Sequence, residues 1–338
     1  MDLEVFWFIL IGILLAGYAF LDGFDLGVGI VFYAAKTDRE RRLFMNSIGP
    51  IWDGNEVWLV TFGGALFAAF PDVYATSFSA FYLPFMLLLV CLIFRAVSME
   101  FRSKVTSPAW RRVWDFAFFV SCTVASFLFG VAVGNAMVGL PIGPEQEFHG
   151  HLGHLLGFYP VLVGCLVVAL FALHGSVYLF LKTEHDLQAR LKPLMWKSFG
   201  IFLVLYLIAT IVTLVTIPHA VAPFRQVGPA WIAVLISILA LGNIPRSLYL
   251  DRPGQAFLSS GATILSLTAL FGAALYPNMM VSSLGPQYNL TITNSSSSQE
   301  TLQLMQIIAF LGLPFVLSYS AVVYWVFRGK VKLDDMSY

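Results

Sequence analysis

Long apolar stretches alternate with short polar ones along the whole chain. A helix needs roughly 20 apolar residues to cross a bilayer, because it rises about 1.5 Å per residue. Nine stretches satisfy this length, and we expect each of them to be a membrane-spanning helix. They cover approximately residues 5–35, 51–71, 74–98, 113–137, 157–181, 196–217, 229–247, 256–277 and 302–327. A short turn at Pro71 and Asp72 joins the second and third, which predicts an antiparallel hairpin.

The composition agrees with a membrane protein. Hydrophobic residues make up 59% of the chain and charged residues 11%, whereas roughly a quarter of the residues of a soluble domain are charged. The N-terminus, with Asp2 and Glu4, lacks the basic start of a signal peptide, so we expect the first stretch to be retained as a span. No loop is long enough for a soluble domain, so we predict one all-α transmembrane domain over residues 1–338.

The basic residues predict the orientation of these helices. If the N-terminus lies outside, 18 of the 19 Lys and Arg residues fall in the inner loops and the inner C-terminal tail, and only Arg225 falls outside. The inner set lies at residues 36–42, 95–112, 182–197, 246–252 and 328–332. Positive charge accumulates on the cytoplasmic side of membrane proteins. We therefore expect an outer N-terminus and a cytoplasmic C-terminus.

Two pairs of acidic residues lie within or beside the first two stretches. Asp22 and Asp25 belong to the first stretch, and Asp53 and Glu56 lie at the start of the second. Residues three apart share one helical face. Asp22 lies roughly 25 Å along its helix from the outer surface, and Asp53 enters from the cytoplasmic side. We therefore expect all four carboxylates to gather toward the inner face.

Acidic side chains at this depth are costly unless they face protein or water. Three roles remain open for the four carboxylates. They can carry protons from the cytoplasm to a buried site, they can bind a cation, or they can cap helices and pair with a nearby arginine. Arg95, at the end of the third stretch, is a candidate partner for an acid such as Glu56 or for a propionate. It is equally suited to be a positively charged anchor at the inner surface.

The histidines and cysteines give little support to a metal site. His174 stands alone in the middle of the fifth stretch, so we favour a hydrogen-bonded structural role over haem ligation or proton relay. His149, His151 and His154 have the spacing H-x-H-x-x-H, but their loop offers no convincing zinc geometry. The three cysteines lie in apolar runs and form no C-x-x-C pair. We expect no metal in this chain.

Four motifs carry a resemblance that extends over the length of the chain. They are G-Y-A-F-L-D-G-F-D-L-G-V-G at 17–29, N-S-I-G-P-I-W-D-G-N-E-V-W-L at 46–59, F-R-x-x-x-x-x-F-R-S-K at 94–104 and G-V-A-V-G-N at 130–135. With them the chain resembles subunit II of the cytochrome bd quinol oxidases. The two N-terminal motifs are long and highly specific.

The resemblance implies a fold, a reaction and partners. Members of this family have two four-helix bundles plus one further helix, and they pair with subunit I, which carries three haems and the quinol-binding loop. The complex oxidises membrane quinol and reduces O2 to water. Subunit II ordinarily has no haem, so no cofactor is expected on this chain alone, apart from a structural quinone or lipid at its surface. A small single-span accessory subunit often joins the pair. The resemblance places the complex in the bacterial or archaeal plasma membrane. It implies no nucleic-acid partner.

The resemblance also implies roles for particular residues, none of them catalytic. Asp53 and Asp22 match acids proposed to line a cytoplasmic proton route, and we group Asp25 and Glu56 with them. Trp58 matches a residue beside an oxygen-entry path. The alternative hypothesis is a stand-alone secondary transporter, driven by a cation at Asp22 and Glu56.

Overall fold

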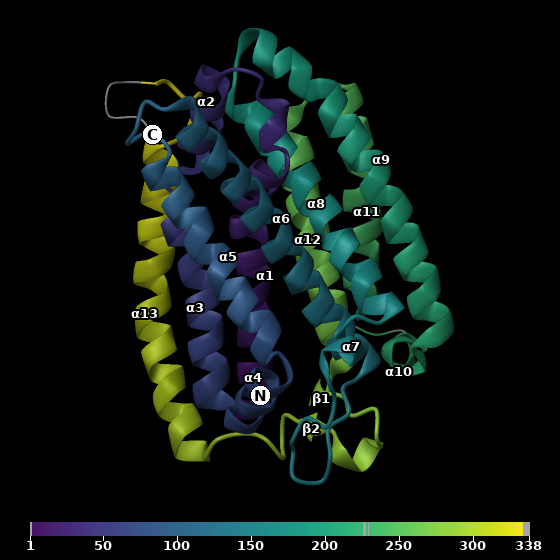
Figure 1. Ribbon diagram of the computed structural model, residues 1–338. Helices are drawn as coiled ribbons and strands as arrows, with labels where there is room; N and C mark the ends of the chain where they lie inside the picture. Colours follow the sequence, from purple (N-terminus) through teal and green to yellow (C-terminus); the bar gives the residue numbers. More distant parts are fainter. Residues whose placement is uncertain (1, 226–227, 229, 334–338) are drawn as a thin grey trace.

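The computed structural model describes residues 2–225, 228 and 230–333. Its long helices run side by side, and short helices and a small β-hairpin cover their ends (Figure 1). Among the described residues, eight helices are long and apolar enough to cross a membrane. These are α1 (Leu3–Ile30), α5 (Tyr82–Phe101), α6 (Pro108–Val138), α8 (Phe158–Lys182), α9 (His185–Thr216), α11 (Ala230–Tyr249), α12 (Pro253–Leu275) and α13 (Gln299–Val326).

The predicted segment 51–71 corresponds to α3 (Trp52–Ala69), which lies among the long helices in Figure 1. It has 18 residues, and Asp53, Asn55 and Glu56 lie in its first two turns. These polar residues make α3 less apolar than the eight helices above, and it is not one of the eight candidate spans among the described residues.

The hairpin predicted at Pro71 and Asp72 is wrong in its details. Pro71 is the first residue of a separate helix, α4 (Pro71–Ala80), which lies between α3 and α5. Proline is suited to this place because the first N–H groups of a helix have no partner within it. The apolar segment expected at 74–98 is therefore divided between α4 and α5.

The remaining elements are short and lie at the two ends of the bundle. At one end, α2 precedes α3, and the C-terminal end of α13 lies nearby (Figure 1). At the other end, β1 and β2 pair in antiparallel fashion. The short elements are η1 (Phe32–Ala34), α2 (Asp38–Ile48), α7 (Leu152–Leu155), α10 (Pro218–Val221), η2 (Ala222–Phe224), β1 (Asn278–Met280), η3 (Pro286–Tyr288) and β2 (Leu290–Thr291).

The most central helix is α1, which packs against α3, α6, α8 and α12. The second half of α1 is buried, and Phe24, Leu26 and Val28 are fully inaccessible to solvent. Its glycines allow this close approach. A Cβ atom on Gly27 would lie 2.0 Å from the carbonyl oxygen of Phe171 in α8. Small residues at such crossings allow the backbones of membrane helices to pack directly against each other.

In contrast, α13 lies at the edge of the molecule. Its main contacts are with α1 and α3, and none of the residues in its most apolar 18-residue window is buried. Its large apolar side chains point away from the rest of the chain, and Leu304, Phe310 and Phe315 are more than half exposed. The inner and outer helices of this protein therefore differ sharply in how much of their surface the chain itself covers.

The packing of α1 against α8 predicts the effect of enlarging Gly27. In Gly27→Ala the new methyl group meets backbone atoms, so the two helices must separate, which we expect to cost about 1–3 kcal/mol. The thermal unfolding midpoint of the purified protein in detergent should fall. Gly12→Ala on the same helix is the control, because a Cβ atom there would meet no neighbouring helix or side chain within 4 Å. Equal midpoints for the two variants would contradict the close helix contact.

A capping box at the start of α2 predicts a pH dependence. Burial of the Glu40 carboxyl group opposes its ionisation and raises its pKa. The backbone N–H groups of Lys36 and Thr37 and the Arg190 guanidinium stabilise the ionised form and lower the pKa by more. The pKa of Glu40 is therefore lowered. A carboxyl group with a lowered folded-state pKa stabilises the fold above its unfolded pKa, and this contribution is lost as the pH falls through the folded value.

We therefore expect acidification from about pH 7 to about pH 4 to lower the thermal midpoint of the native protein more than that of Glu40→Gln. Glutamine keeps the capping geometry but does not titrate. Glu100→Gln, at an exposed position, should retain the native pH profile. Parallel profiles for the native protein and Glu40→Gln would refute the prediction.

Candidate functional site

A buried arginine joins three helices at the most polar place inside the bundle. Arg95 of α5 is 1% exposed. Its Nη1 donates to both carboxylate oxygens of Asp22 in α1, at 2.7 and 2.8 Å. Its Nη2 donates to Oε2 of Glu56 in α3, at 2.9 Å. The guanidinium also lies 5.7 Å from the ring centroid of Trp52. One cation thus holds two acids that are distant in the sequence.

A second set of hydrogen bonds lies beside this ion pair and includes α13. Asn55 Nδ2 donates to Asp25 Oδ2 at 2.7 Å, and the Tyr324 hydroxyl donates to Asn55 Oδ1 at 2.7 Å. Asp25 is fully buried. Its Oδ1 has no hydrogen-bond partner among the described residues. Asp25 therefore keeps one free acceptor oxygen inside the protein.

The structure brings three of the four predicted acids together and leaves one apart. Asp22, Asp25 and Glu56 all belong to the network around Arg95 and Asn55. Asp53 is exposed at the start of α3, and its side chain makes no hydrogen bond or ion pair with another described residue. The sequence groups Arg95 with the basic residues of the inner loops, but the residue lies inside α5.

Trp58 is half-buried and packs against α1. A Cβ atom on Gly17 would lie 2.3 Å from Cε3 of the Trp58 ring. The glycine therefore makes room for the indole. This contact places the Trp58 ring against α1, and the predicted place of Trp58 beside an oxygen-entry path stays a prediction.

Two residues of the network were not predicted from the sequence. Asn55 stands between Asp53 and Glu56 in the motif W-D-G-N-E, and an amide inside an otherwise apolar segment was the available signal for it. Tyr324 gave no comparable signal, because tyrosines are common near the ends of membrane helices. Its role depends on the packing of α13, which is close to the C-terminal end of the sequence, against α3.

The charges of this cluster do not balance. Asp22, Asp25 and Glu56 are three acids, and among the described contacts Arg95 is the one basic side chain that reaches them. Burying several uncompensated negative charges is very costly in a low-dielectric interior. The cluster is therefore chemically suited to hold protons, and a change in its proton content changes its charge.

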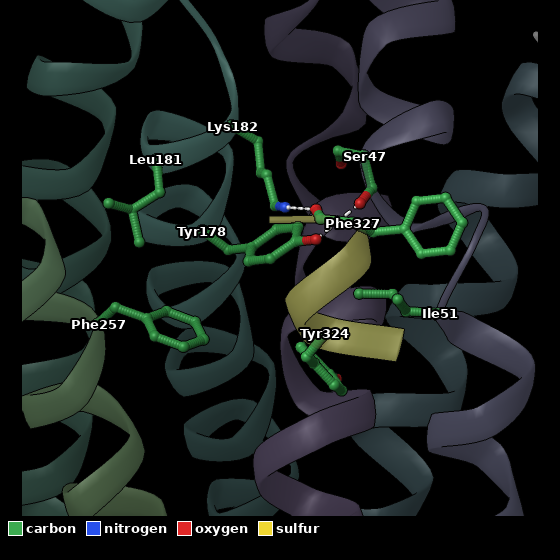
Figure 2. Close-up of a pocket in the computed structure, with 8 residues that line it drawn as sticks. All are labelled: Ser47, Ile51, Tyr178, Leu181, Lys182, Phe257, Tyr324 and Phe327. Carbon is green, nitrogen blue, oxygen red and sulfur yellow. Dashed lines mark hydrogen bonds between the residues drawn. The ribbon is translucent and has the colours of Figure 1, made fainter. Parts of the chain in front are cut away.

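A small cavity of about 120 Å³ lies next to the network, where Tyr324 lines it (Figure 2). Tyr178 donates to the carbonyl oxygen of Ser47 at 2.6 Å, and Lys182 Nζ donates to that of Phe327 at 2.7 Å. The volume of this cavity suffices for a few water molecules but is well below the roughly 300–1,000 Å³ typical of organic-ligand pockets.

His174 lies on α8, on the other side of α1. It is fully buried. Its Nδ1 lies 2.7 Å from the Ser260 hydroxyl, its Nε2 lies 3.2 Å from the carbonyl oxygen of Phe20, and its ring stacks on Phe257. Both ring nitrogens therefore have hydrogen-bond partners within the chain. The described residues also contain no group of three His, Cys, Asp or Glu side chains suited to a metal ion.

The fold and the cluster together define a multi-pass membrane protein with buried acids paired to an arginine inside its helices. The chain belongs to the cytochrome bd terminal oxidase subunit II family, whose model matches residues 3–327. It is therefore a subunit of a cytochrome bd oxidase, an oxidoreductase complex, and a subunit II implies a partner subunit.

Relatives from two bacteria match along the whole chain. The chain is 36% identical over 343 residues to the cytochrome bd ubiquinol oxidase subunit 2 of Bacillus subtilis (strain 168), covering 100% of this chain and 99% of that relative. It is 34% identical over 366 residues to the cytochrome bd-I ubiquinol oxidase subunit 2 of Escherichia coli (strain K12), covering 99% of this chain and 96% of that relative.

A solved structure agrees with this fold. The bd oxidase from Geobacillus thermodenitrificans contains a chain that superimposes with a TM-score of 0.80, at 17% sequence identity, over 97% of this chain and 99% of that one. The family match, together with this fold, favours the oxidase hypothesis over the stand-alone transporter.

The buried ion pair predicts a large penalty for removing its cation. Arg95→Gln leaves Asp22 and Glu56 without a counter-charge, and we expect a loss of about 3–5 kcal/mol, seen as a lower thermal midpoint and yield. In the double variant Asp22→Asn/Arg95→Gln one of the stranded charges is gone, so part of the loss should be recovered. A single variant as stable as the native protein, or a double variant no better than the single one, would contradict the assigned pairing.

Proposed function

We propose that this chain is the haem-free partner subunit of a cytochrome bd-type terminal oxidase and that its buried acids conduct protons toward the oxygen-reducing site of the haem subunit. The complex oxidises membrane quinol and reduces O2 to water, with three haems in subunit I. The observation that carries the proposal is the cluster of Asp22, Asp25 and Glu56 around the single cation Arg95.

A graded exposure of the acids supports a route from the cytoplasm. Asp53 is exposed at the first turn of α3. Glu56 lies one turn further along the same helix, and its side chain is 22% exposed. Asp22 is fully buried and shares Arg95 with Glu56. In the proposed route Asp53 collects protons, Glu56 passes them inward, and Asp25 with its free acceptor oxygen holds one beyond the ion pair.

The direction of the route depends on the proposed topology. The positive-inside rule makes the end that contains α2 and the last turn of α13 cytoplasmic, and Asp53 follows α2 closely in the sequence. Protons consumed in forming water then come from the cytoplasm, while quinol protons leave outside. This arrangement builds a membrane potential without a separate pump.

The exposed face of α13 supports a docking surface for the haem subunit. This helix is nearly uncovered by its own chain, although its Tyr324 belongs to the buried network. A transmembrane helix that contributes to an internal site is expected to be held by more than its packing against α1 and α3. We propose that subunit I packs on α13 and on the neighbouring outer faces of α3 and α5.

The same proposal includes the remaining expectations for the complex. The hydrogen-bonded ring of His174 supports a chain that ligates no haem. A small single-span accessory subunit, and a structural quinone or lipid at the surface, would bind to the outer helices. The chain would form one transmembrane domain of two four-helix bundles, with α13 as the further helix, in the bacterial plasma membrane.

The proton route predicts a defect in turnover without a defect in assembly. Asp53→Asn and Asp25→Asn should each slow quinol-dependent oxygen uptake by the purified complex by about tenfold or more, with a native haem spectrum per mole of complex. Asp186→Asn is the matched control, because it removes an exposed acid from the first turn of α9, and it should keep native turnover. Loss of haem from the two test variants, or native turnover in both, would overturn the proposed route.

A further inference from the structure

A second polar site lies where α5 ends and α6 begins, on the side of α2. It is a groove of about 440 Å³ that the acid cluster around Arg95 does not include. Four of its lining residues are arginines and two are aspartates. The lining residues are Asp38, Arg41, Arg102, Pro108, Arg111, Arg112 and Asp115.

Ion pairs hold three of the four arginines of this groove in place. Asp115 is fully buried and accepts from Arg102 Nε at 2.5 Å and from Arg41 Nη1 at 2.7 Å. Asp38 accepts from Arg102 Nη2 at 2.8 Å and from Arg111 Nη1 at 3.2 Å. Two carboxylates thus face four guanidinium groups, so the groove carries an excess of two positive charges.

Several N–H groups of the arginines in this groove have no hydrogen-bond acceptor among the described residues. The Arg102 side chain is 2% exposed, and its Nη1 has no hydrogen-bond partner among the described residues. The buried Nε atoms of Arg41 and Arg111 are also unpartnered there. A buried N–H group without a partner is costly, and the loss is greater for a charged group. An anion with several acceptor oxygens would satisfy these donors, because guanidinium groups bind phosphate with paired hydrogen bonds.

We propose that this groove binds a phosphate group, carried by an anionic phospholipid or by a soluble phosphate compound. The position favours the lipid. The groove lies at the end of the bundle that the basic residues assign to the cytoplasm, where the leaflet is rich in anionic lipid. Val113 and Phe116, each 61% exposed, follow Arg112 on α6 and offer an apolar surface for an acyl chain. This binding site goes beyond the oxidase function of the complex.

The test uses the purified oxidase complex, stripped of loosely bound lipid, and compares it with the double variant Arg111→Gln/Arg112→Gln. Both arginines lie at the rim, so the pairs of Asp115 with Arg102 and Arg41 remain. The control Arg252→Gln/Arg328→Gln also removes two exposed charges from the same end of the bundle. Native mass spectrometry with added phosphatidylglycerol measures lipid binding, and ³¹P NMR line broadening measures binding of inorganic phosphate.

We expect phosphatidylglycerol to bind the native complex and the control about tenfold more tightly than the rim variant, and millimolar inorganic phosphate not to displace it. That result assigns the lipid as the source of the phosphate group. Binding of inorganic phosphate that needs the two arginines, without such a lipid effect, supports the same site with a soluble ligand. Equal binding of both probes to the native complex and the rim variant would overturn the proposal.

Discussion

The inner structure depends on the ion pairs that the buried guanidinium group of Arg95 makes with Asp22 and Glu56. A charge in a low-dielectric interior is tolerated only with well-placed opposite charges. Asp22 and Glu56 supply them from two other helices. The positions of α1, α3 and α5 are therefore coupled through one side chain. The close approach of α1 to α8 at Gly27 completes this arrangement, because it buries the part of α1 that carries the acids.

The same constraint leads from structure to function. Arg95 neutralises only part of the negative charge that Asp22, Asp25 and Glu56 can carry, and we propose that protons supply the balance. A site whose charge depends on protons, reached from an exposed acid on α3, is suited to deliver protons to a partner. Tyr324 extends the network to α13, whose outer face is uncovered. The interior of the chain is thereby connected with the surface where we propose that the haem subunit docks.

Most of the long helices and the pairing of the acids on helical faces could be predicted from the sequence. The length of an apolar stretch and the spacing of its polar residues are properties of one local segment. The apolar stretches indicated the long helices, and the three-residue spacing placed each acidic pair on one face. The division between α4 and α5 was missed, because the apolar character of 74–98 continues across the break at Phe81. Arg95 was counted with the basic residues of the inner side although it fell within the expected span 74–98, because a charge near the end of a span resembles a surface anchor until its partners are known.

Contacts between distant segments could not be predicted from one sequence. Nothing local in the sequence brings Tyr324 to Asn55, or Arg102 to both Asp38 and Asp115. Asp53 and Glu56 share a helical face, yet the first is exposed and the second pairs with Arg95. The difference arises because Glu56 lies one turn deeper, within reach of α5. Depth and neighbouring helices, rather than spacing alone, decide which acids enter the site.

The most direct test of the proposed function is affinity purification of the tagged chain from its native membranes, with an optical spectrum and an oxygen-uptake assay of the eluate. We predict that a larger subunit co-elutes, that the eluate shows reduced-haem bands, and that added quinol drives oxygen uptake. A helical but colourless single chain, obtained under conditions that keep other bd oxidases intact, would contradict the claim that this protein works as the partner of a haem subunit.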